Sequence, residues 1–171
     1  YLNDLDDGRP KGLRLDLSTG DVRRYQGPIW QLHPDERYAV SPCLLRANLT
    51  QPGYGVPVPP ERQPVNTATA EPDDGLFRVD LATGEQTLLL NLEACWEALE
   101  HREDLADAVL YAFHVKFNPA GDRLMLVVRA RGADGSFVAS LLTGRVDAEG
   151  REVTDLRTTV SHRLWRRGGH H

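Results

Sequence analysis

Hydrophobic and polar residues alternate in three similar segments of the chain, and each segment ends in a Thr-Gly pair. The segments span residues 12–20, 75–84 and 135–144. Alternation with a period of two is typical of a strand with one buried face, and a glycine after the strand favours a tight turn. Because the unit recurs, the pattern predicts a repeat architecture, either the blades of a β-propeller or the turns of a solenoid.

A second pattern precedes two of these segments. Residues 30–40 and 114–128 each read as strand, polar turn and strand, and the second turn is Pro119-Ala-Gly-Asp122. Proline fixes φ and glycine tolerates a positive φ, which a tight hairpin needs. Outer strands are expected at residues 22–25, 86–90 and 152–159. One blade would then consist of two inner strands, the strand before Thr-Gly and an outer strand.

The two ends of the sequence fit incomplete blades. After residue 159 the pattern restarts at 160–165 as the first strand of another blade, and residues 1–3 resemble the end of an inner strand. We therefore expect a single partial propeller domain at residues 1–167, with blade boundaries near residues 28 and 112. Residues 168–171, Gly-Gly-His-His, resemble the remnant of a purification tag.

Two insertions explain the length of the repeat. The first and second Thr-Gly pairs lie 64 residues apart and the second and third 60, whereas common propeller blades take about 40 to 50 residues. Residues 51–74 hold six of the eleven prolines, which cannot donate to a sheet, so an extended loop is expected there. Residues 91–109 have apolar positions near helical spacing, which predicts an amphipathic helix with Asn91 as its N-cap. This helix either packs on a sheet edge or binds a partner.

These patterns together predict an all-β fold. We expect a β-propeller segment of about two to three four-stranded antiparallel blades, with one inserted helix and a proline-rich loop. The composition of 40% hydrophobic and 26% charged residues is that of an ordinary globular domain. The expected location stays open between the periplasm and the cytoplasm.

Composition also excludes several classes of partner. The net charge is −5, and no basic cluster is interleaved with aromatic residues, which argues against nucleic-acid binding. No apolar run approaches the roughly 18 residues of a spanning helix, so no membrane span is expected. Cys43 and Cys95 are expected to be free thiols rather than a disulfide.

One turn carries a family resemblance. Asn118-Pro119-Ala-Gly121, followed by Arg123-Leu-Met-Leu, resembles the Pro-Asp-Gly hairpin of TolB-type and oligogalacturonate-lyase-type β-propellers. Four segments in order resemble uncharacterised bacterial propellers related to these lyases: residues 45–55, 74–84 and 114–125, and Ser161-His162 with Trp165. The resemblance implies a propeller of more blades than this sequence holds. It also implies that histidines near the central channel, with a glutamine, hold a divalent metal.

Three histidines are the candidates for chemistry. His33, His114 and His162 fall at or near the first strand of a blade, which lines the channel of a propeller. We expect His114 and His162 to be the catalytic residues and the ligands of a divalent metal, Mn or Ca, or an acid-base pair. The alternative is that each imidazole hydrogen-bonds a neighbouring backbone carbonyl. His33, next to Pro34 in a turn, is expected to face solvent.

Other polar and aromatic positions are candidates for ligand binding. Tyr54 lies between two glycines, so its ring is a candidate stacking platform for a saccharide, or a plug in the channel mouth. Trp165 and His33 are the other expected ligand contacts. Asp16 and Asp80 occupy the same position of the repeat, and we expect them to accept hydrogen bonds from the Thr-Gly turn or a neighbouring blade.

Two functions remain open. The chain lacks a Gly-x-Ser-x-Gly elbow, a phosphate loop and a Cys-x-x-Cys pair, which argues against serine catalysis, nucleotide hydrolysis and structural zinc. The first function is binding of a polar, saccharide-like ligand on the channel face, with metal-assisted lyase activity in the full-length protein. The alternative is a non-catalytic, TolB-like scaffold for protein-protein interaction. In either case we expect self-association or further blades, because unpaired blades expose apolar faces.

Overall fold

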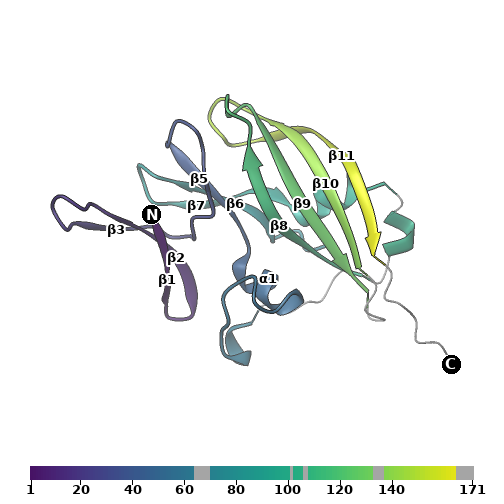
Figure 1. The fold of residues 1–171 in the computed structure, drawn as a ribbon, viewed down its shortest axis with the longest axis horizontal. Helices are drawn as coiled ribbons and strands as arrows, with labels where there is room; N and C mark the ends of the chain where they lie inside the picture. The colour runs from purple at the N-terminus through teal and green to yellow at the C-terminus, as the bar shows by residue number, and fades with distance from the viewer. Residues whose placement is uncertain (64–69, 101, 106–107, 133–136, 165–171) are drawn as a thin grey trace.

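The strands of the described residues form three antiparallel sheets, and the strands of each sheet lie side by side in sequence order (Figure 1). The computed structural model describes residues 1–63, 70–100, 102–105, 108–132 and 137–164. The first sheet consists of β1 (Leu2–Asp6), β2 (Arg9–Leu15) and β3 (Val22–Arg24). The second consists of β4 (Gln31–Leu32), β5 (Tyr38–Pro42), β6 (Gly75–Asp80) and β7 (Gln86–Asn91). The third consists of β8 (Val109–Phe117), β9 (Arg123–Arg131), β10 (Phe137–Val146) and β11 (Val153–Leu164).

The first two copies of the repeated segment end as the sequence predicts. The Asp16 carboxylate accepts hydrogen bonds from the backbone N–H of Ser18 at 2.9 Å and of Thr19 at 3.3 Å. The Asp80 carboxylate accepts from the backbone N–H of Ala82 at 2.8 Å and of Thr83 at 2.9 Å. These bonds close the turn after β2 and after β6. The expected role of both aspartates in the Thr-Gly turn is therefore confirmed.

The third copy departs from this pattern. Thr143 and Gly144 lie inside β10, so the prediction of a turn there is wrong. Ser140 stands where the other copies have aspartate, and it offers no carboxylate to the turn. The chain instead turns at Asp147, whose carboxylate accepts from the backbone N–H of Arg151 at 2.6 Å and of Glu152 at 2.7 Å. The turn follows the carboxylate because that group satisfies the free amides of the loop.

The predicted restart at residues 160–165 is also wrong for the part that the structure describes. Val160 pairs with Leu141, and pairing continues to Leu164 opposite Phe137, so these residues extend β11 rather than begin a new blade. The reason is that β10 is ten residues long and offers a hydrogen-bonding partner along its whole length. Trp165 lies outside the described residues.

The described residues contain two α-helices, where the sequence predicts one. The helix predicted over residues 91–109 forms only as α2 (Leu92–Glu97). The Asn91 side chain accepts from the Ala94 N–H at 2.8 Å, which confirms the N-cap. The second helix, α1 (Leu44–Thr50), precedes the proline-rich loop, which contains the short 3₁₀ turn η1 (Pro60–Arg62). A further 3₁₀ turn, η2 (Arg102–Leu105), follows α2. No helix among the described residues is long and apolar enough to cross a membrane.

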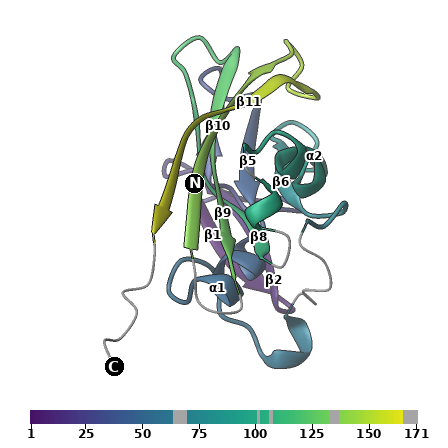
Figure 2. The same ribbon diagram turned by 90° about the vertical axis from the view of Figure 1, so that its right-hand side faces the viewer.

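Two hydrophobic clusters join the sheets. The larger cluster lies between the second and third sheets and includes α2, which packs beside both (Figure 2). Its most deeply buried members include Val40, Leu76, Leu92, Leu110 and Leu126. The smaller cluster packs the segment between β3 and β4 against the second sheet and consists of Tyr25, Ile29, Ala39, Val79 and Leu81. The breaks between the sheets fall between Arg24 and Gln31 and between Asn91 and Val109.

Two glycines in the hairpins of the third sheet lie directly against aromatic rings of the second sheet. A Cβ at Gly121 would lie 2.1 Å from His33 Nε2, and one at Gly150 would lie 2.3 Å from the ring of Tyr38. Both glycines have positive φ, 78° and 65°. In the matching hairpin of the second sheet, Glu36 holds the position of Gly121 with a φ of 55°. A residue with a Cβ pays about 1 to 2 kcal/mol for this conformation.

We predict opposite effects for the two hairpins. Gly121→Ala should lower the free energy of unfolding by more than about 2 kcal/mol, because it combines backbone strain with an overlap against His33. Glu36→Gly should raise it by about 0.5 to 1 kcal/mol, because it relieves the same strain on an exposed loop. Urea unfolding followed by circular dichroism measures both values. Equal effects of the two substitutions would contradict the packing of Gly121 on His33.

Candidate functional site

A bulge in β8 places two rings side by side on the third sheet. Ala112 pairs with Val128 and Val115 pairs with Leu126, so Phe113 and His114 together face a single residue of β9. Such a bulge inserts one extra residue and re-aims the side chains beside it. The two rings are stacked, with centroids 4.1 Å apart and planes 10° from parallel. His114 is exposed, whereas Phe113 is 2% exposed and forms the floor beneath it.

Two further aromatic rings from distant segments complete an aromatic cluster. Tyr54, in the loop after α1, meets Phe113 edge to face at 5.1 Å. Trp30, just before β4, lies 5.8 Å from the His114 ring. Tyr54 is 50% exposed and Trp30 is 39% exposed. We call these four residues, Trp30, Tyr54, Phe113 and His114, the aromatic cluster. The rings of Trp30 and Tyr54 are partly exposed, and the ring of Phe113 is buried.

Arg129 of β9 supplies a positive charge to this cluster. Its guanidinium carbon lies 3.7 Å from the centroid of the Phe113 ring. Nη1 donates to the side-chain oxygen of Gln51, which also accepts from the Tyr111 hydroxyl at 3.2 Å. Nε is buried and has no hydrogen-bond partner among the described residues. The arginine is therefore held in place by an aromatic face and an amide, and no ion pair joins it to a carboxylate of the described residues.

The same strand fixes the segment that carries Tyr54. Arg131 Nη1 donates to the carbonyl oxygen of Thr50 at 2.7 Å, at the end of α1. A cation at this end of a helix satisfies a carbonyl that lacks a partner within the helix. At the other end of the insertion the buried Arg46 pairs with Asp74, with 2.5 Å between Nε and the carboxylate oxygen. These contacts position Tyr54 over β8.

The environment of His114 keeps its imidazole neutral. Partial burial lowers the pKa of His114 below its usual value, and the charges of Arg129 and Lys116 lower it further. At pH 7 the ring therefore offers one donor and one acceptor nitrogen. Such a ring can hydrogen-bond a hydroxyl of a ligand, accept a proton or donate a lone pair to a metal.

His33 is buried, so the expectation that it faces solvent is wrong. Its ring is 7% exposed, is stacked on Tyr38 at 4.5 Å and meets Phe117 edge to face at 5.1 Å. Nδ1 lies 2.5 Å from a carboxylate oxygen of Asp35, and Nε2 lies 3.1 Å from the carbonyl oxygen of Gly121. The Pro34 turn folds the ring inward, where the third sheet covers it. This geometry gives His33 a structural role. It agrees with the alternative expectation that the imidazole hydrogen-bonds a backbone carbonyl.

The structure does not bring the strands of His114 and His162 together. His162 lies on β11, where its backbone pairs with Ala139, and its side chain is outside the described part. β8 and β11 are the two edges of the third sheet, so three strand spacings, about 14 Å in all, separate them. No group of three His, Cys, Asp or Glu side chains that could hold a metal is found among the described residues. The metal site at these two histidines stays a prediction.

Sequence reasoning placed Tyr54 and His114 as candidates without showing that they meet. It did not assign Trp30, Phe113, Arg129 or Gln51. The Phe113-His114 pair interrupts the alternation of β8, which is the one local signal of a bulge. The contacts of Arg129 and Gln51 join positions 78 residues apart, which no local pattern reveals.

Comparison of the chain with protein-family models, with curated proteins and with solved structures finds no match. The resemblance to TolB-type and lyase-type propellers therefore rests on the quoted residues alone.

We predict that Asp35 stabilises the His33 turn in a pH-dependent way. Burial by itself would raise the pKa of Asp35, but hydrogen bonds from the Arg37 backbone and from the His33 and Arg37 side chains lower it to about 2, from 3.8. A carboxylate with a depressed pKa stabilises the fold above its unfolded-state pKa, and this stability is lost as pH falls toward 2.

Asp35→Asn should therefore lower the free energy of unfolding at pH 6 by no more than about 1 kcal/mol, because the carboxylate is partly exposed and screened. The difference from the parent protein should shrink between pH 4 and pH 2. Urea unfolding at several pH values measures it, with Asp73→Asn as a control on an exposed loop. A difference that stays constant over this range would contradict the assignment.

Proposed function

We propose that the chain is a segment of a β-propeller and that the aromatic cluster binds a polar, saccharide-like ligand. Three consecutive antiparallel sheets, each with its strands in sequence order, support the propeller proposal. The observation that carries the binding proposal is the pair of half-exposed rings, Trp30 and Tyr54, on either side of the Phe113-His114 stack.

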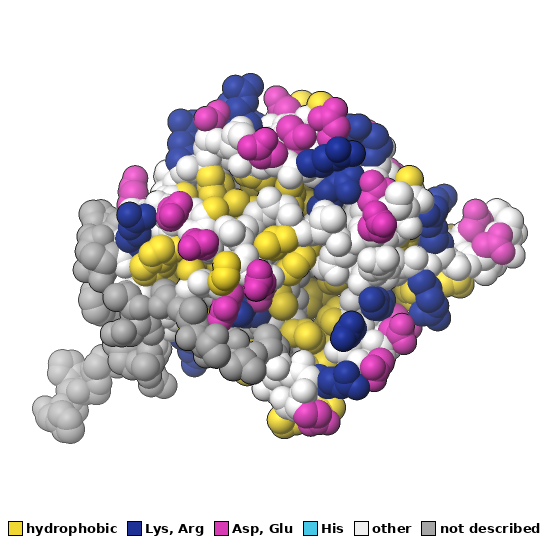
Figure 3. Space-filling model, turned by 180° about the vertical axis from the view of Figure 1, so that it is seen from behind, with side chains coloured by type: hydrophobic (Ala, Val, Ile, Leu, Met, Phe, Trp, Pro, Cys, Tyr) yellow, Lys and Arg dark blue, Asp and Glu magenta, His cyan; other side chains and the backbone are white. Residues whose placement is uncertain are grey.

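The chemistry of the cluster favours an anionic sugar. Aromatic faces pack against the apolar C–H face of a sugar ring, while the neutral His114 imidazole can hydrogen-bond a hydroxyl group. Arg129 lies under the same cluster, and a guanidinium binds a carboxylate through two parallel hydrogen bonds. A uronic acid unit offers both the ring and the carboxylate. On the face that Figure 3 shows, acidic and basic side chains are interspersed around exposed hydrophobic side chains.

The finer form of the proposal is a metal-assisted lyase reaction, with His114 and His162 as ligands of Mn or Ca or as an acid-base pair. Because the two residues lie on opposite edges of one sheet, a shared ion would need groups from beyond this sheet. Millimolar manganese should then raise the melting temperature of the parent protein and not that of His114→Gln. Saccharide binding through the aromatic cluster does not depend on this metal.

We predict that trigalacturonate binds the parent protein and that Tyr54→Ala weakens the binding about tenfold, the value of an aromatic contact of about 1 to 1.5 kcal/mol. Trp30→Ala should weaken it similarly. Arg129→Gln should weaken the binding of trigalacturonate more than the binding of a neutral trisaccharide. Isothermal titration calorimetry measures the dissociation constants.

Tyr1→Ala is the matched control, because Tyr1 is a 45% exposed tyrosine outside the cluster. Circular dichroism checks that each variant is folded. An equal loss in Tyr1→Ala, or the lack of saturable binding at millimolar trigalacturonate, would contradict the proposal.

Exposed apolar residues support the alternative proposal, a scaffold that associates through its outer sheets. Leu15 and Val22 lie opposite each other in the first sheet and are 43% and 54% exposed. In the third sheet Met125 and Val160 are 36% and 41% exposed. Neighbouring blades of a propeller cover such faces. A second copy of the chain, or further blades, would cover them here.

We predict that the chain self-associates at micromolar concentration and that Leu15→Lys with Val22→Lys makes it monomeric, because charges are costly in an apolar interface. Leu17→Lys is the control, since Leu17 is 90% exposed in the turn between β2 and β3. Multi-angle light scattering measures the mass. A monodisperse monomer of the parent protein would contradict self-association and leave the saccharide proposal unaffected.

A further inference from the structure

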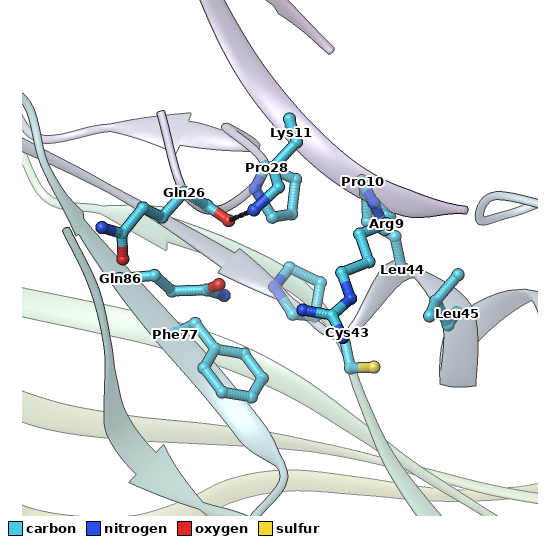
Figure 4. A pocket seen from close by; sticks show the side chains of 11 residues that line it. Arg9, Pro10, Lys11, Gln26, Pro28, Cys43, Leu44, Leu45, Phe77 and Gln86 are labelled. Atoms are coloured by element: carbon cyan, nitrogen blue, oxygen red, sulfur yellow. Dashed lines mark hydrogen bonds between the residues drawn. The ribbon is translucent and has the colours of Figure 1, made fainter. Parts of the chain in front are cut away.

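A groove of about 490 Å³ lies between the first and second sheets (Figure 4). Its volume is in the range of small-molecule sites. Eleven residues line it, and none of them belongs to the aromatic cluster. The groove therefore offers a second binding site that is independent of the function proposed above.

One side of the groove is apolar. Pro42 ends β5, Leu44 begins α1 and Phe77 lies on β6, and all three line the groove together with Pro28 of the junction before β4. Pro42, Leu44 and Pro28 are buried and Phe77 is half-buried. An apolar body placed here would exclude water from these surfaces, which is the main favourable term in binding.

Among the described residues, the opposite side of the groove carries two cationic side chains and no carboxylate. Arg9 and Lys11 both lie on β2, two residues apart, and therefore on the same face of this strand. Figure 4 shows the Arg9 guanidinium extending into the groove above Cys43. Burial raises the pKa of the Cys43 thiol to about 11, so this residue adds no negative charge at pH 7. The eleven lining residues include no aspartate or glutamate.

The carboxylates nearest in register do not neutralise these cations. Asp6 pairs with Arg9 and Asp4 pairs with Lys11 across the β1–β2 hairpin. No ion pair joins Asp6 to Arg9 in the described structure, and Asp4 lies 3.7 Å from Arg24 instead. Lys11 Nζ donates to the backbone carbonyl of Gln26 at 2.8 Å, which leaves two N–H groups. The groove thus combines an apolar wall with uncompensated positive charge.

We propose that this groove binds a small carboxylate with an apolar body, with the carboxylate on Arg9 and Lys11 and the body against Phe77 and Leu44. A guanidinium and an ammonium bind a carboxylate by charge-assisted hydrogen bonds. The side-chain amides of Gln26 and Gln86, which also line the groove, provide further donors beside the carboxylate. A neutral molecule of the same shape would lose the contacts that the cations provide.

The test is a titration of the full chain at constant ionic strength, with NMR chemical shifts as the readout. The four probes are benzoate, phenylacetate, hexanoate and octanoate. We expect at least one probe to bind saturably, and its neutral amide to bind at least tenfold more weakly. Arg9→Gln should weaken binding about tenfold, and Lys11→Gln should also weaken it. Arg14→Gln is the matched control, because Arg14 is an exposed arginine of the same strand outside the groove.

Three results would overturn the proposal. The first is that none of the four probes binds saturably at concentrations up to about 10 mM. The second is that the neutral amide binds as tightly as its carboxylate. The third is that Arg14→Gln weakens binding as much as Arg9→Gln. Should Arg9→Gln fail to fold by circular dichroism, Arg9→Lys keeps the charge and should retain most of the binding. Tyr54→Ala should leave this binding unchanged, so failure here and failure of the saccharide proposal are distinguishable.

Discussion

The packing of the second sheet on the third is the contact on which the rest of the structure depends. Tyr38 is 1% exposed and forms a cluster of three mutually contacting rings with His33 and Phe117. Gly121 and Gly150 in the hairpins of the third sheet pack against His33 and Tyr38. Only glycine permits the backbone of one sheet to approach the rings of the other so closely. This contact fixes the relative position of β4 and β8. It therefore decides that Trp30, which precedes β4, meets His114 on β8.

The aromatic cluster depends on the bulge in β8. A continuous strand would place Phe113 and His114 on opposite faces of the sheet, whereas the bulge aligns their rings. The buried Phe113 ring then supports the exposed His114 ring, and the Arg129 guanidinium lies over the face of the Phe113 ring. The result is a surface with an apolar plane, a neutral imidazole and a cation. These are the three kinds of group that an acidic sugar can use.

The segment between β5 and β6, which consists of α1 and the first insertion, contributes to both proposed sites. The start of α1, at Cys43 and Leu44, lines the groove between the first and second sheets, and the loop after α1 carries Tyr54 to the aromatic cluster. The buried pair of Arg46 and Asp74 ties the two ends of the insertion together. Breaking a buried ion pair leaves an uncompensated charge, so this insertion has one preferred position. A short helix thus has a structural effect at both of its ends.

The sequence by itself determined the elements that depend on local chemistry. It predicted the strands before Thr-Gly, the carboxylates of Asp16 and Asp80 in their turns, the Asn118 to Gly121 hairpin and the Asn91 cap, because each depends on hydrogen bonds within a few residues. The third copy has Ser140 in place of the aspartate, and the turn predicted there was wrong. The chain turns at Asp147 instead.

Only the tertiary structure decided which of these elements meet. The burial of His33, the extension of β11 along β10 and the helix α1 all depend on partners far away in the sequence, which local patterns do not encode. The same holds for the site: Tyr54 and His114 were recognisable by residue type, but their contact through Phe113 and the place of Arg129 follow from the bulge and from sheet packing. Long-range packing chooses among locally acceptable arrangements, because the burial of apolar surface is a property of the assembled sheets.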